Sequence, residues 1–179
     1  MNIYISGGAK NGKSTFAQRK AKELAEADGT GLYYVATMIA RDSEDDARVA
    51  RHRREREGWG FTTLEVPAGI SKVPRIADPE GTFLLDSVTA LLQNEMFRDD
   101  GTVDTKAGER VAEELALLAA GPGNWVMVSD YLFADPGPFG EYTEIYRKSL
   151  AAIDRHMAGI CEAVVEISAG IAVYPKGDN

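Results

Sequence analysis

The segment Gly7-Gly8-Ala9-Lys10-Asn11-Gly12-Lys13-Ser14 constrains the fold and the chemistry of this chain more than any other feature. It follows a short apolar run, residues 3–5, and leads into a stretch of helical character. The spacing G-x-x-x-x-G-K-[ST] between a strand and a helix is the P-loop signature. Its glycines let backbone N–H groups converge on phosphate oxygens, and the start of the helix adds the positive end of its dipole. The segment therefore predicts a site for the phosphates of a nucleotide.

Two side chains of this segment have a predicted chemical role. The ammonium group of Lys13 reaches the β- and γ-phosphates, and the hydroxyl of Ser14 is a ligand for Mg²⁺. A glycine-rich turn that arose by chance is the alternative, but the flanking strand and helix favour the P-loop. We therefore predict that GTP or ATP binds here together with Mg²⁺. The predicted binding residues are Gly7, Gly8, Ala9, Lys10, Asn11, Gly12, Lys13 and Ser14.

Composition limits the classes of protein to which the chain can belong. Its 179 residues suit one domain with a single core, which we expect to span residues 1–179. The formal net charge of −8 argues against a nucleic-acid partner, because no excess of cations is present to neutralise phosphates. No apolar run is long enough to span a membrane, and the N-terminus lacks a signal-peptide pattern. The lone Cys161 excludes an internal disulfide, which fits a reducing cytosol, and we expect it to be a small buried hydrophobic residue. The chain is therefore predicted to be an acidic cytoplasmic enzyme.

Apolar segments rich in β-branched residues alternate with segments of helical character. This alternation predicts an α/β fold of the P-loop NTPase type, with a mostly parallel sheet and helices on both of its faces. The short break at residues 168–170 predicts a C-terminal hairpin. Residues 67–79 and 135–140 are expected to be irregular loops because of their Pro and Gly content. The expected strands are residues 3–6, 32–36, 83–86, 125–129, 163–167 and 171–174, and the expected helices are residues 13–27, 44–57, 87–97, 105–119 and 142–160.

Two carboxylates follow expected strands, where ligands bind in sheets of this kind. A carboxylate at the end of an apolar strand near a P-loop is the usual place for the acid that organises Mg²⁺, and Asp86 is the residue predicted for it. The alternative is that Asp86 caps the helix that follows it. Asp130 is a second candidate for the same role, although it can simply begin a loop.

The basic segment Arg48-Val49-Ala50-Arg51-His52-Arg53-Arg54-Glu55-Arg56 is a second unusual feature of an otherwise acidic chain. At helical spacing, Arg48, His52 and Arg56 share one face. Neighbouring cations disfavour the imidazolium form, so His52 is expected to be neutral and able to attack a phosphate that the arginines hold. The alternative is a solvated helix with weak surface ion pairs, and these residues alone favour it. The other histidine, His156, is interpreted as an ordinary surface residue.

Six segments appear in an order that is typical of one known family: residues 7–14, Tyr34-Val35-Ala36-Thr37, Arg48-Val49-x-x-His52-Arg53, Thr62-x-x-Glu65, Leu84-Leu85-Asp86-Ser87-Val88-Thr89 and Glu166-Ile167-x-x-Gly170. Together they resemble the bifunctional adenosylcobinamide kinase / adenosylcobinamide-phosphate guanylyltransferase of cobalamin assembly. The resemblance spans nearly the whole chain. Because the histidine segment is far more specific than the P-loop, it favours a functional role for His52 over the solvated helix.

The resemblance implies two reactions on one corrinoid substrate. A nucleoside triphosphate phosphorylates the aminopropanol hydroxyl of adenosylcobinamide, and GMP is then transferred from GTP to adenosylcobinamide phosphate. His52 would be the catalytic nucleophile that carries GMP covalently, and the enzyme would be a homotrimer with the histidine helix near a subunit boundary. Besides residues 7–14, with Lys13 catalytic, the implied nucleotide-binding residues are Ala36, Thr37, Met38, Arg53, Arg54, Glu55, Arg56, Glu65 and Asp86, of which Asp86 shares the metal with Ser14.

One segment departs from the family pattern. Where the family has Asn-Glu-Val-Gly after the fourth strand, this chain has Ser129-Asp130-Tyr131-Leu132, and Asp130 is a candidate to supply the carboxylate of the family's Glu. Because loops after strands carry substrate contacts, the segment 129–140 leaves corrinoid binding and phosphorylation open. Two alternative functions remain: a small-metabolite P-loop kinase without a covalent intermediate, and a GTP-binding regulatory module.

Overall fold

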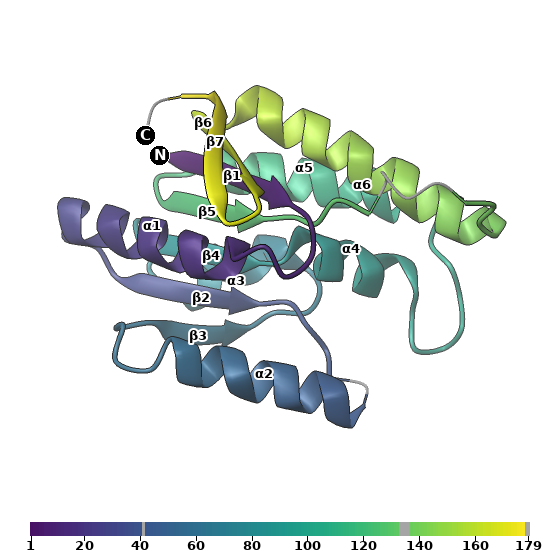
Figure 1. The fold of residues 1–179 in the computed structure, drawn as a ribbon, viewed down its shortest axis with the longest axis horizontal. Helices are drawn as coiled ribbons and strands as arrows, with labels where there is room; N and C mark the ends of the chain where they lie inside the picture. The colour runs from purple at the N-terminus through teal and green to yellow at the C-terminus, as the bar shows by residue number, and fades with distance from the viewer. Residues whose placement is uncertain (41, 133–136, 178–179) are drawn as a thin grey trace.

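One seven-stranded sheet organises the chain, with the strand order β3-β2-β4-β5-β1-β6-β7 (Figure 1). The computed structural model describes residues 1–40, 42–132 and 137–177. The strands are β1 (Asn2–Gly7), β2 (Leu32–Ala36), β3 (Thr62–Glu65), β4 (Thr82–Asp86), β5 (Asn124–Val128), β6 (Ala163–Ser168) and β7 (Ile171–Lys176). The helices are α1 (Lys13–Asp28), α2 (Ser43–Glu55), the short 3₁₀ helix η1 (Ile70–Lys72), α3 (Val73–Ile76), α4 (Val88–Met96), α5 (Ala107–Ala119) and α6 (Glu141–Ile160).

The pairing of the strands confirms the predicted sheet. Strands β1 to β6 all pair in parallel, while β7 returns antiparallel to β6 as the expected C-terminal hairpin. The P-loop strand β1 lies between β5 and β6, so the segments that follow these three strands meet at the same edge of the sheet.

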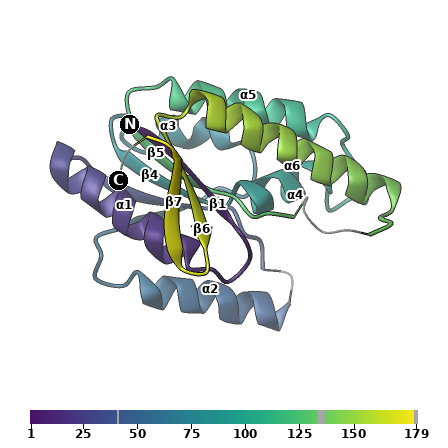
Figure 2. The same cartoon turned by 45° about the horizontal axis from the view of Figure 1, so that its top comes forward.

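Helices cover both faces of the sheet, as predicted, but unequally. Successive residues of a strand point to opposite faces, and in β1 Tyr4 joins the core under α3, α4, α5 and α6 while Ile3 and Ile5 join the core under α1. Figure 2 shows α5 and α6 on one side of the sheet and α1 on the other. Cys161 is buried as expected, and burial raises the pKa of its thiol to about 12. None of the helices in the described ranges is long and apolar enough to cross a bilayer.

Three expectations about local structure need correction. Residues 62–65 were not expected to be a strand, yet they form the edge strand β3, whose four residues are too few to show a clear alternation. Residues 67–79 are not irregular throughout, because they contain η1 and α3, with a proline in the first turn of α3, where its missing N–H costs nothing. The basic helix ends at Glu55, so Arg56 lies beyond it rather than on its face. Of the expected loop at residues 135–140, residues 135 and 136 lie outside the described ranges.

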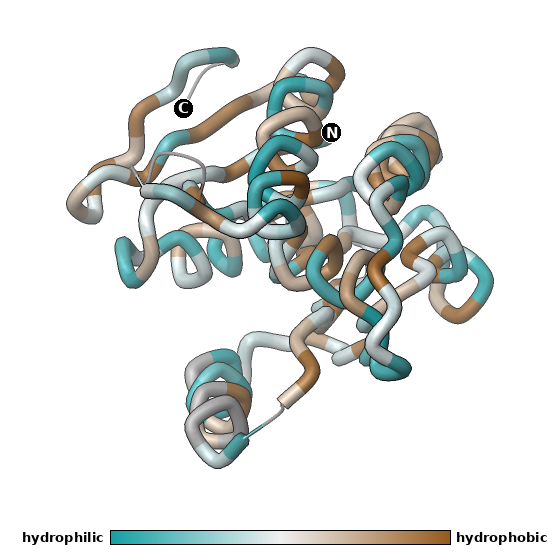
Figure 3. The backbone as a smooth tube through the Cα atoms, turned by 90° about the vertical axis from the view of Figure 1, so that its right-hand side faces the viewer, coloured by the Kyte–Doolittle hydropathy of each residue, from teal (hydrophilic) through white to brown (hydrophobic). Residues whose placement is uncertain are grey.

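The basic helix α2 differs from the other long helices in how it packs. None of its described side chains is buried, whereas α1, α4, α5 and α6 each bury a stripe of residues. Figure 1 places α2 beside the edge strand β3, and Figure 3 shows it standing apart from the rest of the chain. The described side chains of α2 therefore contribute nothing to either hydrophobic core.

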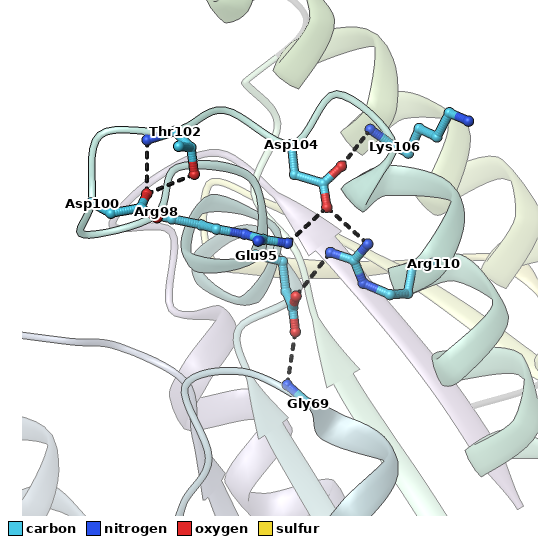
Figure 4. Close-up of polar contacts among 8 residues, drawn as sticks. All are labelled: Gly69, Glu95, Arg98, Asp100, Thr102, Asp104, Lys106 and Arg110. Atoms are coloured by element: carbon cyan, nitrogen blue, oxygen red, sulfur yellow. Dashed lines mark hydrogen bonds and ion pairs between the residues drawn. The ribbon is translucent and has the colours of Figure 1, made fainter.

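A network of ion pairs fixes the end of α4 (Figure 4). The guanidinium of Arg110, on α5, donates to Glu95 at 3.0 Å and to Asp104 at 2.9 Å, and Arg98 reaches Asp104 at 3.1 Å. The other carboxylate oxygen of Glu95 accepts the backbone N–H of Gly69 at 2.7 Å. The network thus ties the loop after β3 to the helix that follows β4.

Candidate functional site

The backbone of the P-loop takes left-handed conformations at two positions. Gly12, the residue before α1, has a φ of 86°, and Lys10 has a φ of 59°. A Cβ atom at Gly7 would lie 2.4 Å from the carbonyl oxygen of Ile167, so the approach of β6 leaves room only for glycine there. The loop therefore leads directly into the first turn of α1, whose N–H groups have no partners within the helix and can bind an anion.

Lys13 forms an ion pair at the end of the sheet. Its side chain is only 6% exposed, and Nζ lies 2.7 Å from Oδ1 of Asp130. The same ammonium group donates to the carbonyl oxygen of Gly8 at 2.5 Å. The backbone N–H of Asp130 donates in turn to the hydroxyl of Thr89 at 2.9 Å. Asp130 thus does more than begin a loop, because it joins the P-loop lysine to α4.

Asp86 does not cap the following helix. The residue before α4 is Ser87, whose hydroxyl accepts the N–H of Ala90, so Ser87 is the cap. The carboxylate of Asp86 instead accepts the Tyr34 hydroxyl at 2.8 Å on its Oδ2 atom. The capping alternative is therefore wrong, and the carboxylate is left at the carboxyl end of β4.

A pocket of about 240 Å³ lies beyond the carboxyl ends of β2, β4 and β5. At one end it is lined by His52, Arg53, Arg56 and Glu65, and at the other by Asp130. Asp86 also lines it. The pocket therefore joins the histidine segment to the carboxylate that contacts the P-loop lysine. Its complete lining is Tyr34, Ala36, Met38, Ile39, Val49, His52, Arg53, Arg56, Glu65, Asp86, Ser87, Thr89, Ala90, Gln93, Asn94 and Asp130.

Arg56 is the most deeply placed cation of the pocket lining. It is 7% exposed, its guanidinium carbon lies 3.9 Å from the centre of the Tyr34 ring, and it donates to the hydroxyl of Thr63 at 3.2 Å. Burial lowers the pKa of the guanidinium, while the nearby charges of Asp86 and Glu65 act in the opposite direction. A desolvated cation of this kind interacts strongly with any phosphate that enters the pocket.

The other charged residues of the basic segment are placed less deeply. Arg53 forms an exposed ion pair with Glu65, and both line the pocket. Arg54 is exposed and is not among the lining residues. The side chains of Arg48 and Glu55 lie outside what the structure describes. His52 lines the pocket from α2, and His156 is an exposed residue of α6, as expected.

The residues at the end of β2 have two different roles, since some line the pocket and one supports it from below. Ala36 and Met38 line the pocket. Thr37 is fully buried, and its hydroxyl donates to the carbonyl oxygen of Ser87 at 2.8 Å and accepts the N–H of the same residue at 2.7 Å. The Thr37 side chain therefore joins the segments after β2 and β4 beneath the pocket, and its neighbours Ala36 and Met38 line the pocket.

The first turns of α4 contribute residues that the sequence had not indicated. Thr89, Gln93 and Asn94 line the pocket, and the Asn94 amide donates to the carbonyl oxygens of Thr37 and Pro67 at 2.7 and 3.0 Å. These residues lie beyond the positions that directly follow the strand, so the pattern of strand ends does not indicate them. Since α4 begins at the carboxyl end of β4, its first turns face the same edge of the sheet.

The donors present suit Mg²⁺ rather than a metal held by the protein alone. Among the described residues, no three His, Cys, Asp or Glu side chains come together as a metal site. Mg²⁺ is commonly bound by one or two protein oxygens together with substrate phosphates and water. The hydroxyl of Ser14, in the first turn of α1, and the carboxylate of Asp86 are oxygen donors of the required kind.

Comparison with known sequences points to one family. Residues 3–174 match the family model described as cobinamide kinase / cobinamide phosphate guanyltransferase. The chain is 34% identical over 179 residues to the bifunctional adenosylcobalamin biosynthesis protein CobP of Pseudomonas aeruginosa, covering 99% of each chain. It is 28% identical over 193 residues to the bifunctional adenosylcobalamin biosynthesis protein CobU of Escherichia coli, covering 98% of this chain and 100% of the relative.

Comparison with solved structures supports the fold. The KaiC-like protein PH0186 of Pyrococcus horikoshii superposes with a TM-score of 0.57 at 14% identity, covering 99% of this chain and 80% of that one. A second solved structure, an ATPase domain, superposes with a TM-score of 0.56 at 10% identity, covering 98% of this chain and 76% of that one. At these identities the likeness establishes a P-loop NTPase fold and nothing about the substrate.

Proposed function

Since the chain belongs to the cobinamide kinase / cobinamide phosphate guanyltransferase family, we propose that it phosphorylates adenosylcobinamide and then transfers GMP from GTP to the product. Residues 1–179 would act as one domain that carries both activities. The observation that carries the proposal is one shared pocket with His52 at one end and, at the other, Asp130 in contact with the P-loop lysine.

The first reaction takes place at the P-loop. Backbone N–H groups at the start of α1 and the ammonium group of Lys13 hold the triphosphate, with its γ-phosphate toward the pocket. The aminopropanol hydroxyl of the corrinoid attacks the γ-phosphorus, and the nucleoside diphosphate leaves. Ser14 and Asp86 would hold Mg²⁺, which when bound neutralises charge on the phosphates.

The second reaction takes place at the histidine end. A ring nitrogen of His52 attacks the α-phosphorus of GTP, a P–N bond forms, and pyrophosphate leaves. An oxygen of the corrinoid phosphate then attacks the same phosphorus, which breaks the P–N bond and regenerates the imidazole. Because the first reaction needs the γ-phosphate at Lys13 and the second needs the α-phosphate at His52, the triphosphate would lie in a different pose in each.

Arg53 and Arg56 are suited to the second reaction. Both line the pocket beside His52, and a guanidinium offers two parallel donors to phosphate oxygens. Arg56, which is buried, would stabilise the charge that develops on the α-phosphate and on the leaving pyrophosphate. Glu65 and Asp86, two acids of the lining, would contact the base or the ribose of GTP.

We further propose that the enzyme assembles as a homotrimer, as the family resemblance implies. The proposal is supported by the placement of α2, which stands apart from the sheet with no described side chain buried within its own subunit (Figure 3). Sedimentation equilibrium with the purified protein tests it, and a monomeric mass would exclude the trimer.

The covalent intermediate can be tested by labelling. Wild-type protein is incubated with Mg²⁺ and GTP labelled at the α-phosphate, then denatured and examined for bound label. We expect an acid-labile, alkali-stable label on the wild type and none on His52→Ala, which should still bind GTP. His156→Ala is the matched control, because it removes the other histidine at an exposed position and should be labelled like the wild type.

Label that persists on His52→Ala would assign the nucleophile to another residue. If no protein is labelled although GTP binding is intact, the chain is a P-loop kinase or a GTP-binding regulatory module instead.

A further inference from the structure

We propose that Asp130 is the general base of the phosphorylation reaction, accepting the proton of the acceptor hydroxyl as the hydroxyl oxygen attacks the γ-phosphorus. The proposal rests on the proposed function, because it concerns the first of its two reactions. It gives a catalytic role to the segment in which this chain departs from the family pattern.

The position of Asp130 is fixed from two sides. Its Oδ1 atom lies 2.7 Å from Nζ of Lys13, and its backbone N–H donates to the Thr89 hydroxyl at 2.9 Å. The side chain is 23% exposed, and the residue lines the pocket. Because β5 pairs directly with the P-loop strand, the carboxylate faces the place where Lys13 binds a γ-phosphate.

An acceptor hydroxyl in the pocket can reach both reacting groups. A γ-phosphate bound to Lys13 would lie close to the Asp130 carboxylate, with the ammonium group of Lys13 in contact with both anions. A hydroxyl group beside them donates its proton to the carboxylate and presents an oxygen lone pair to the phosphorus. This is the arrangement that the reaction needs.

Asp86 and Asp130 have different partners, which suggests different roles. Asp86 accepts a hydrogen bond from the neutral hydroxyl of Tyr34. Asp130, by contrast, lies in direct contact with the ammonium group of Lys13. Because Lys13 already neutralises the Asp130 carboxylate, Asp86 is the better ligand for Mg²⁺, and the same contact places Asp130 beside the γ-phosphate, where a base must lie.

The step balances without a further reactant. The O–H bond of the acceptor breaks and its proton passes to Asp130, while a bond forms between the oxygen and the γ-phosphorus. The bond from the γ-phosphorus to the bridging oxygen breaks, and its electron pair leaves with the nucleoside diphosphate. The proton returns to solvent through the pocket.

The charged and titratable groups around Asp130 are Lys13 on α1, Asp86 at the end of β4, and Tyr146 and Asp154 on α6.

The test compares the two reactions in one variant of the full chain. Phosphorylation is measured with cobinamide and ATP, and GMP transfer is measured separately with supplied cobinamide phosphate and GTP. For Asp130→Asn, we expect phosphorylation to fall by about 10² to 10⁴-fold, with GMP transfer within about threefold of the wild type, since His52 needs no external base. Asp78→Asn is the matched control, because it makes the same change at an exposed residue outside the pocket.

Further readouts separate a base from other roles. Asp130→Glu should recover part of the lost phosphorylation, and the wild-type rate should fall at low pH along a limb that Asp130→Asn lacks. Recovery of Asp130→Asn at high Mg²⁺ would instead make Asp130 a metal ligand. A loss of phosphorylation that comes from a higher KM for ATP, with kcat close to that of the wild type, would make it a residue that only positions the P-loop lysine. Either result would overturn the proposal that Asp130 is the general base.

The wild type distinguishes the two levels of the proposal. If the wild type phosphorylates cobinamide and Asp130→Asn does so equally well, only the role of Asp130 as the base is excluded. If the wild type phosphorylates no cobinamide, the proposed function is wrong, and the role of Asp130 in that reaction is excluded with it.

Discussion

The two ends of the pocket are built in opposite ways. At the P-loop end, Lys13 is 6% exposed and its ion pair with Asp130 lies at the carboxyl ends of the central strands β1 and β5. At the histidine end, the ion pair between Arg53 and Glu65 has side chains that are 58% and 64% exposed, on a helix and an edge strand. The P-loop end of the pocket is therefore buried, whereas the histidine end is largely exposed to solvent.

The difference indicates how one chain can carry two reactions. Phosphoryl transfer at the P-loop needs groups held rigidly at fixed positions, and the central strands provide such positions. Formation and breakage of a bond to His52 require two acceptors to reach the same phosphorus in turn, which suits a helix whose described side chains are not locked into the core. Arg56 connects the two parts, because it follows α2 in the chain and lies on the ring of Tyr34.

The largest effect is expected from breaking this connection. Arg56→Ala removes a buried cation from the Tyr34 ring and from the Thr63 hydroxyl, so the free energy of unfolding should fall by about 1–3 kcal/mol. GMP transfer should fall by at least about 10²-fold, and phosphorylation of cobinamide should fall much less. Urea denaturation and separate assays of the two reactions measure these changes.

Arg75→Ala is the control, since it removes an exposed arginine of α3 that does not line the pocket. It should leave stability and both reactions close to those of the wild type. If Arg56→Ala lowers the two reactions equally, the distinction between the two ends does not hold.

The stability of the buried end should also depend on pH through Asp154. Burial raises the pKa of Asp154, although its Oδ1 atom accepts hydrogen bonds from Tyr4 at 2.6 Å and Ser129 at 2.8 Å. The folded protein therefore holds this proton more tightly than the unfolded chain does. As a result, the contribution of Asp154 to stability is greatest below the ordinary pKa of 3.8 and is lost as the pH rises through the raised value.

Unfolding by urea at a series of pH values from about 4 to 8 measures this effect. The free energy of unfolding of the wild type should fall relative to that of Asp154→Asn as the pH rises, because the variant has no proton to lose. A difference between the two proteins that stays constant with pH would show that Asp154 does not titrate in this range.

The smallest effect is expected at the exposed end. Glu65→Gln breaks the ion pair with Arg53, and since both side chains are more than half exposed, stability should change by no more than about 1 kcal/mol. The change should disappear in about 1 M NaCl, where surface charges are screened. A larger loss that persists in salt, measured by thermal denaturation, would mean that this pair helps to hold α2 in place.

The parts of the fold that could be predicted are those that local sequence determines. The P-loop residues follow a fixed spacing, and β1, β2, β4, β5 and the final hairpin were expected within a few residues of their observed bounds. The position of Asp86 also followed from the sequence, because a carboxylate directly after an apolar strand lies at the ligand-binding edge of a parallel sheet.

The remaining features depend on contacts between distant parts of the chain. The helical spacing of the basic segment continues through Arg56, but the helix ends at Glu55, and the Arg56 side chain is buried against Tyr34 of another element. The pair between Lys13 and Asp130 requires β5 to lie beside β1, which no local pattern specifies. Asn94 joins the pocket only because α4 lies over the ends of β2 and β3.

The central claim is that His52 serves GMP transfer and not phosphorylation, although both reactions share one pocket. The most direct test incubates cobinamide and Mg²⁺ with GTP labelled at the γ-phosphate and, in parallel, at the α-phosphate, using the wild type and His52→Ala. The account predicts that the wild type transfers both labels to the corrinoid, while His52→Ala transfers the γ-label at a similar rate and no α-label. Transfer of the α-label by His52→Ala, or loss of both labels from a variant that is folded and binds GTP, would contradict it.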